Sequence, residues 1–185
     1  NIVKSKYNCL KKSMKDATLV FLIDKEKNRI CLAMKKRGFG VGKWNGFGGK
    51  VDDEHGEKVI DAAIREIGEE TESENGQIGV TLLPGDLNKV AEIDFRFEQK
   101  PEWSQKVHVF LAYNWQGQPN ESEEMRPQWY DISEIPYEDM WVDDEYWLPR
   151  VLSGEKITAL FDFNENQELL GYKIDSSDFP QIKLK

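Results

Sequence analysis

Short apolar runs separated by polar turns are the main pattern along this chain, and they predict β-strands. Residues 18–23 (TLVFLI) predict a buried strand, residues 24–28 a polar turn, and residues 30–34 the returning strand. Further segments of the same character predict strands at 90–97, 106–115, 128–132, 157–163 and 169–174.

Residues 57 to about 72 carry apolar side chains at helical spacing instead, which predicts a helix with one buried stripe. The predicted stripe consists of Val59, Ile60, Ala63, Ile64 and Ile67. Gly68 lies inside this helix, where glycine costs about 1 kcal/mol relative to alanine, so we expect close packing at that position.

A second helix is expected at residues 143–152. Asp143 belongs to a residue type that caps helix N-termini, and Pro149 predicts that this helix is bent or begins late. Many strands with two well-separated helices are typical of the α+β class. We therefore expect one α+β domain over residues 16–185.

Composition fits a globular protein, with 39% hydrophobic and 32% charged residues among 185. No apolar run approaches the roughly 20 residues of a membrane helix, so we expect no membrane partner. The net charge of −9 argues against a broad surface for stable nucleic-acid binding. Cys9 and Cys31 provide neither a disulfide framework nor zinc-site spacing, which favours a reducing compartment.

Residues 1–15 form a basic N-terminal extension with five lysines and no acidic residue. We interpret it as a solvated, flexible tail; a targeting remnant or a contact with an anionic surface is the alternative. The chain begins with Asn1 and shows no secretory signal, which indicates a fragment, a processed form or a trimmed chain.

A glycine-rich loop at residues 35–49 leads toward the first predicted helix and lets the backbone approach a ligand closely. In the helix, Glu66, Glu69 and Glu70 are spaced i, i+3, i+4 and form one face, a quarter turn or more from the apolar stripe. These like charges repel one another. Mg²⁺ prefers oxygen ligands and is often shared with phosphates, so the pattern predicts a metal and a phosphorylated substrate. The alternative is a solvated acidic helix face.

Loop and helix together resemble the box of the Nudix family, G-x5-E-x7-R-E-U-x-E-E-x-G-U, in which U is aliphatic. The matching residues are Gly49, Glu57, Arg65, Glu66, Glu69 and Glu70. Seven residues instead of five separate Gly49 from Glu57, and we expect the loop to absorb this insertion. Glu72 stands where the family has glycine, which we expect to change how the helix ends.

The resemblance implies the Nudix fold, an α/β/α sandwich with a mixed β-sheet, and a Mg²⁺-dependent hydrolase, with Mn²⁺ as an alternative metal. It implies that the metal is bound by Gly49, Glu66, Glu69, Glu70 and Glu124. It further implies that Arg65 and Glu57 pair to brace the loop on the helix. Glu70 is the expected base or water-orienting group.

Four longer segments resemble the animal MutT homologues within this family, which hydrolyse oxidised purine nucleoside triphosphates such as 8-oxo-dGTP and 2-oxo-dATP to the monophosphate and pyrophosphate. They are MKKRGFG (34–40), WNGFGGKV (44–51), EMRP (124–127) and DMWVDDEYW (139–147). The implied role is sanitation of the nucleotide pool, by a monomer in the cytoplasm, with mitochondrial or nuclear pools as alternatives.

Carried over by position, Asn45, Asp143 and Asp144 would read the purine edge and Trp141 would stack on the base. Thr18 and Lys35 would lie at the rim of the pocket, near sugar and phosphates. The implied pocket lining is Phe39, Phe95, Phe97, Met125 and Trp147. Adjacent acids can have unequal pKa values, so one carboxyl could donate and the other accept a hydrogen bond.

Each of these residues also has a purely structural interpretation. Asp143 could cap a helix, Asn45 could serve a turn, and the aromatic side chains could belong to the core. Two functional alternatives stay open as well: a Nudix pyrophosphohydrolase of another nucleotide substrate, and a non-catalytic nucleotide-binding module. The presence of all three box carboxylates disfavours the second.

Overall fold

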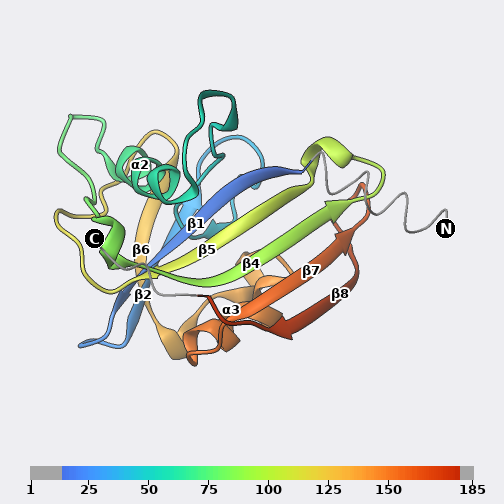
Figure 1. Cartoon of the computed structure of the whole chain (residues 1–185). Helices are drawn as coiled ribbons and strands as arrows, with labels where there is room; N and C mark the ends of the chain where they lie inside the picture. Colours follow the sequence, from blue (N-terminus) through green and yellow to red (C-terminus); the bar gives the residue numbers. More distant parts are fainter. Residues whose placement is uncertain (1–13, 180–185) are drawn as a thin grey trace.

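A single mixed β-sheet organises the chain (Figure 1). The computed structural model describes residues 14–179, and the basic extension lies outside these residues except for Met14 and Lys15. Lys15 is already the first residue of a strand. The strands in the described part are β1 (Lys15–Asp24), β2 (Arg29–Lys35), β3 (Trp44–Asn45), β4 (Leu87–Phe97), β5 (Gln105–Ala112), β6 (Met125–Asp131), β7 (Ile157–Phe163) and β8 (Leu169–Ser176).

The strand order is β3-β2-β1-β5-β4-β7-β8, and β6 also pairs with β2. The pairs β1–β5 and β4–β7 are parallel, and the other pairs are antiparallel. One edge of β2 is shared, because residues 29–31 pair with β1 and residues 33–34 pair with β3. The opposite edge pairs with β6 over the full length of β2. This sharing places the glycine-rich loop beside β1.

The two faces of the sheet are covered by different helices, as Figure 1 shows. Alternation along β1 sends Val20 and Leu22 to the core under α2 (Val59–Thr71), and Phe21 and Ile23 to the core that contains α3 (Asp144–Leu152). Helices on both faces of a mixed sheet form the predicted α/β/α sandwich. Within residues 14–179, no helix is long and apolar enough to cross a membrane.

Most predicted elements are confirmed within a few residues. Among the described residues, the short strand β3 was not predicted, nor were the 3₁₀ helices η1 (Asp53–His55), η2 (Pro84–Asp86), η3 (Pro101–Trp103), η4 (Ile132–Glu134) and η5 (Tyr137–Asp139). Helix α3 starts only one residue later than predicted and continues through Pro149.

Two expectations about α2 need correction or comment. The expected close packing at Gly68 is wrong, because an added Cβ would lie 3.7 Å from the nearest atom, the Val80 carbonyl oxygen, an ordinary contact. The helix ends at Thr71, and Glu72 follows in an extended conformation (φ −70°, ψ 129°). The helix therefore ends without the left-handed residue that glycine would supply there.

Candidate active site

The glycine-rich loop lies directly against β1. Phe47 and Val20 exchange backbone hydrogen bonds of 2.7 and 2.9 Å, and Thr18 N–H donates to the Gly49 carbonyl at 2.8 Å. An added Cβ at Gly48 would lie 2.0 Å from the Thr18 carbonyl oxygen. Residues 47–49 therefore approach β1 closely, while Gly48 and Gly49 also line the aromatic cavity described below, so the expected approach to a ligand stays a prediction. The Gly49 carbonyl, implied as a metal ligand, is already a hydrogen-bond acceptor.

The three carboxylates of α2 lie in three different environments. The side chain of Glu70 is 7% exposed, that of Glu66 17% and that of Glu69 63%. The prediction that the carboxylates lie apart from the buried stripe is thus wrong for Glu70, which follows Ala63 and Ile67 on the buried side of the helix. Burial raises the pKa of Glu70 to about 7, although Gly48 N–H donates to its carboxylate at 2.7 Å. Burial also raises the pKa of Glu66.

Gly49 makes room for Glu66. A Cβ at Gly49 would lie 2.4 Å from the carboxylate carbon of Glu66, so no larger residue fits unless that carboxylate moves. The glycine of the motif is therefore explained by contact with a motif glutamate.

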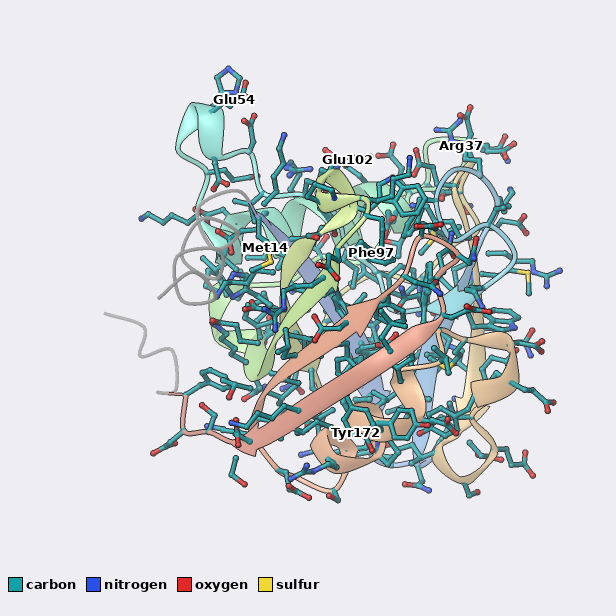
Figure 2. The ribbon with its side chains drawn as sticks, turned by 90° about the vertical axis from the view of Figure 1, so that its right-hand side faces the viewer. Met14, Arg37, Glu54, Phe97, Glu102 and Tyr172 are labelled. Atoms are coloured by element: carbon teal, nitrogen blue, oxygen red, sulfur yellow. The ribbon has the colours of Figure 1, made fainter. Side chains whose placement is uncertain are left out.

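Arg65 and Glu57 form the predicted brace between loop and helix. Arg65 donates through Nε to Glu57 Oε1 at 2.7 Å and through Nη2 to Oε2 at 2.9 Å, and Nη2 also reaches the Lys50 carbonyl at 3.2 Å. The guanidinium lowers the pKa of Glu57 to about 2. Glu57 also accepts from Asp52 N–H at 2.8 Å, which closes the inserted loop. The insertion forms η1, and Figure 2 shows Glu54 of η1 standing out from the body of the molecule.

An acidic cavity of about 310 Å³ opens between α2 and the loop before β6. Glu124 lies in this loop and pairs with Lys35 at 3.5 Å and with Arg37 at 2.7 Å. The lining consists of Arg37, Glu66, Glu69, Glu70, Glu72, Ser73, Glu74, Ser122, Glu123 and Glu124. The structure thus brings Glu124 to the carboxylates of the helix, as predicted.

The carboxylates of this cavity face basic side chains. Arg65 Nη1 lies 2.9 Å from Glu66 and 3.3 Å from Glu69, and Lys35 Nζ lies 3.6 Å from Glu70. Among residues 14–179, no three Asp, Glu, His or Cys side chains are grouped closely enough to hold a metal ion. The donor set still fits Mg²⁺, because several carboxylates, one of them buried, converge on one cavity.

A second cavity, of about 220 Å³, is largely aromatic and apolar. Every residue predicted for the substrate pocket lines it: Thr18, Lys35, Phe39, Asn45, Phe95, Phe97, Met125, Trp141, Asp143, Asp144 and Trp147. Trp141 stacks on Phe39, with ring centroids 5.1 Å apart. Asn45 accepts a hydrogen bond from Gly46 N–H, so it also serves the local turn. Glu70 lines this cavity as well as the acidic one.

Asp143 and Asp144 are each only 3% exposed. Asp143 accepts from Trp147 Nε1 at 3.0 Å, and Asp144 accepts from Trp141 N–H at 3.1 Å. Asp143 occupies the N-cap position of α3, but the predicted cap is wrong in one respect: its side chain makes no capping hydrogen bond. Burial raises the pKa of both carboxyls, that of Asp143 to about 6. Adjacent buried acids with raised pKa values can present one protonated and one ionised carboxyl to a ligand.

Sequence reasoning missed several lining residues, among them Lys43 and Trp103. Lys43 Nζ donates to the Met140 carbonyl at 3.0 Å and lies 5.3 Å from the Trp141 ring centroid. Lys43 directly precedes the quoted segment 44–51, so the neighbouring match was a usable signal. For Trp103 the signal was a large aromatic residue in the polar connection QKPEWSQ (99–105) between two predicted strands.

Comparison with known proteins identifies the family of the chain. The chain matches the NUDIX domain family over residues 14–151. It is 43% identical over 161 residues to the oxidized purine nucleoside triphosphate hydrolase of Mus musculus, covering 87% of this chain and 94% of that protein. Against the Danio rerio protein of the same name it is 43% identical over 158 residues, covering 85% and 92%.

Among solved structures, the MutT protein from Bacillus halodurans is similar with a TM-score of 0.72, covering 88% of this chain and 98% of that one. At 23% identity this likeness supports the fold alone. The family match spans most of the chain and includes α2 and all but the last residue of α3, so the chain belongs to the NUDIX hydrolase family.

Proposed function

We propose that this protein hydrolyses oxidised purine nucleoside triphosphates, of the 8-oxo-dGTP and 2-oxo-dATP type, to the monophosphate and pyrophosphate. One observation carries the proposal: the aromatic cavity and the acidic cavity adjoin and share Glu70. A nucleotide with its base in the first cavity would have its phosphates beside the carboxylates of α2. The names of the mouse and zebrafish relatives, each 43% identical to this chain, support the same substrate class.

The base end of the site supports recognition of a purine edge. Trp141 offers an aromatic face, while Asn45, Asp143 and Asp144 supply polar groups to an otherwise apolar cavity. Buried polar groups that would be left unpaired penalise a wrong base strongly. The aspartate pair is therefore the proposed source of discrimination between oxidised and unmodified purines.

The phosphate end supports divalent-metal chemistry. Glu66, Glu69, Glu70 and Glu124 would hold Mg²⁺, or Mn²⁺, and the bound cation would neutralise phosphate oxygens and lower the pKa of water. Two features of the chain would position the metal-binding carboxylates. The Arg65–Glu57 pair holds the loop against α2, and the missing side chain of Gly49 leaves room for the Glu66 carboxylate. We assign Glu70 the role of orienting or deprotonating the attacking water, because it lies at the junction of the two cavities. We further propose a monomer that acts on free nucleotides in the cytoplasm.

The test is hydrolysis of 8-oxo-dGTP and dGTP side by side, with Mg²⁺ and with chelator, resolving products by chromatography. We expect metal-dependent release of 8-oxo-dGMP and pyrophosphate, with dGTP much slower. Glu70→Gln should abolish turnover, whereas Glu54→Gln, in the projecting η1, should not. Equal turnover of both nucleotides would refute the assigned substrate class, and unchanged turnover in Glu70→Gln would refute the assigned metal site.

A further inference from the structure

Trp103 lines the aromatic cavity, although it lies outside every sequence motif that resembles the family. It ends η3, in the connection between β4 and β5, and is half-buried. Backbone hydrogen bonds within this connection fix its position: Lys100 N–H to the Phe97 carbonyl at 3.2 Å, and Trp103 N–H to the Lys100 carbonyl at 2.9 Å. Phe97 N–H also donates to the buried Ser104 hydroxyl at 3.0 Å. Figure 2 shows Glu102 of η3 at the edge of the molecule, with Phe97 beneath it.

The indole of Trp103 contacts two rings that line the same cavity. Its centroid lies 5.7 Å from that of Phe97, edge to face, and 5.6 Å from that of Phe39. Phe39 in turn stacks on Trp141. An unbroken series of rings thus runs from Trp103 through Phe39 to Trp141.

Phe39 is the exposed member of this series, at 52%. It lies between Gly38 and Gly40, whose φ values of +79° and +82° belong to glycine. The ring of Phe39 is held by aromatic contacts to side chains from three other parts of the chain: Phe97, Trp103 and Trp141. Trp103 therefore supplies one of the three ring contacts that place Phe39 at the cavity.

We propose that Trp103 is an affinity-determining residue of the base site, where it forms an aromatic wall and positions Phe39 against the bound base. This inference rests on the proposed function of the site. Stacking on an aromatic side chain contributes roughly five- to hundredfold to base affinity and depends little on which polar groups the base edge carries. Trp103 is thus expected to act on KM, for oxidised and unmodified purines alike.

A merely structural role makes a different prediction. If Trp103 only packs against the core, replacing it lowers stability and leaves the KM of the folded protein unchanged. The two roles are separated by comparing Trp103→Leu, which removes the aromatic face, with Trp103→Phe, which keeps one. Trp115→Leu is the matched control, because Trp115 is also half-buried and also contacts a ring, that of Trp129 at 5.8 Å, but packs against the other core.

The experiment measures kcat, KM and urea-induced unfolding for wild type and the three variants, with 8-oxo-dGTP and dGTP as substrates. We expect Trp103→Leu to raise KM for 8-oxo-dGTP about tenfold with kcat within about twofold, and Trp103→Phe to restore most of it. The ratio of kcat/KM between the two substrates should not change. In the Phe39→Leu background, the further effect of Trp103→Leu on KM should be smaller than in wild type, because part of it acts through Phe39.

Unchanged KM in Trp103→Leu, or an equal rise in Trp115→Leu, would overturn the inference. A change in the oxidised-to-unmodified ratio would also overturn it, since Trp103 would then read the base edge. These results differ from failure of the proposed function, which would appear in the wild type as no preference for 8-oxo-dGTP.

Discussion

Replacing Asp143 by asparagine tests whether the carboxyl pair of the base site is protonated through burial. Asparagine keeps the size of the side chain and an oxygen that can accept from Trp147 Nε1, now 3.0 Å from Asp143. The substitution removes the carboxyl group that titrates at this position. The variant therefore isolates the free energy that comes from placing an ionisable carboxyl where water is excluded.

The magnitude follows from the pKa. Burial raises that of Asp143 from 3.8 to about 6, so the folded protein holds this proton more tightly than the unfolded chain. The contribution of Asp143 to the unfolding free energy is then fully present below about pH 4 and is lost as pH rises through about 6. Roughly two pKa units correspond to about 3 kcal/mol. Removing the Asp143 charge also lowers the pKa of Asp144, because that pKa is raised first by burial and then by the charge of Asp143.

Urea unfolding of wild type and Asp143→Asn at about pH 4 and about pH 7.5 measures this difference. The unfolding free energy of the variant minus that of wild type should be about 2–3 kcal/mol larger at the higher pH than at the lower pH. Asp131→Asn, at an exposed position of β6, is the control and should follow wild type at both pH values. If the difference between wild type and Asp143→Asn is the same at both pH values, burial does not protonate this pair and the donor–acceptor argument for the base site fails.

Three further substitutions test other parts of the structure. Gly49→Ala places a Cβ 2.4 Å from the Glu66 carboxylate carbon and should lower Mg²⁺-dependent kcat at least about tenfold; a normal kcat would show that Glu66 need not stay where it is. Glu57→Gln weakens the fork to Arg65 and should lower the unfolding free energy by about 1–2 kcal/mol at neutral pH. Because the pKa of Glu57 is lowered to about 2, that difference should shrink in denaturant titrations as pH falls from about 4.5 toward 2, and a constant difference would contradict it. Gly68→Ala should raise the unfolding free energy by up to about 1 kcal/mol in urea melts, since a Cβ there has room; destabilisation would reveal packing that the 3.7 Å clearance does not.

Strands β1, β2, β5 and β7 could be predicted because each contains a local run of mostly apolar residues. Strand β3 could not be predicted, since its two residues lie in a glycine-rich loop and form a strand only by pairing with Ala33 and Met34 of β2. The close packing of residues 47–49 against β1 could not be predicted for the same reason. Glycine indicates that something lies near the backbone, but only the sheet topology shows that at Gly48 it is Thr18 of β1.

At the site, the residues carried over from the family resemblance were found, whereas several other lining residues, among them Lys43 and Trp103, were not. The predicted pocket residues come from segments far apart in the chain, and family resemblance placed them together before any geometry was known. Trp103 lies outside the segments on which that resemblance rests. Its proposed role rests on the contact with Phe39, which no spacing along the sequence encodes.

One helix can serve a buried junction and an exposed rim because successive residues are rotated by about 100°. Glu69 and Glu70 are neighbours in sequence, yet the side chain of the first is 63% exposed and that of the second 7%. Glu66, one turn before Glu70, has an intermediate exposure of 17% and lies against Gly49. The E-x-x-E-E spacing thus does more than gather negative charge on one helix. It arranges carboxylates from solvent inward, so that the innermost, Glu70, reaches the cavity in which a base would bind. A substitution that only neutralises charge should therefore act differently at positions 69 and 70, because only Glu70 touches both cavities.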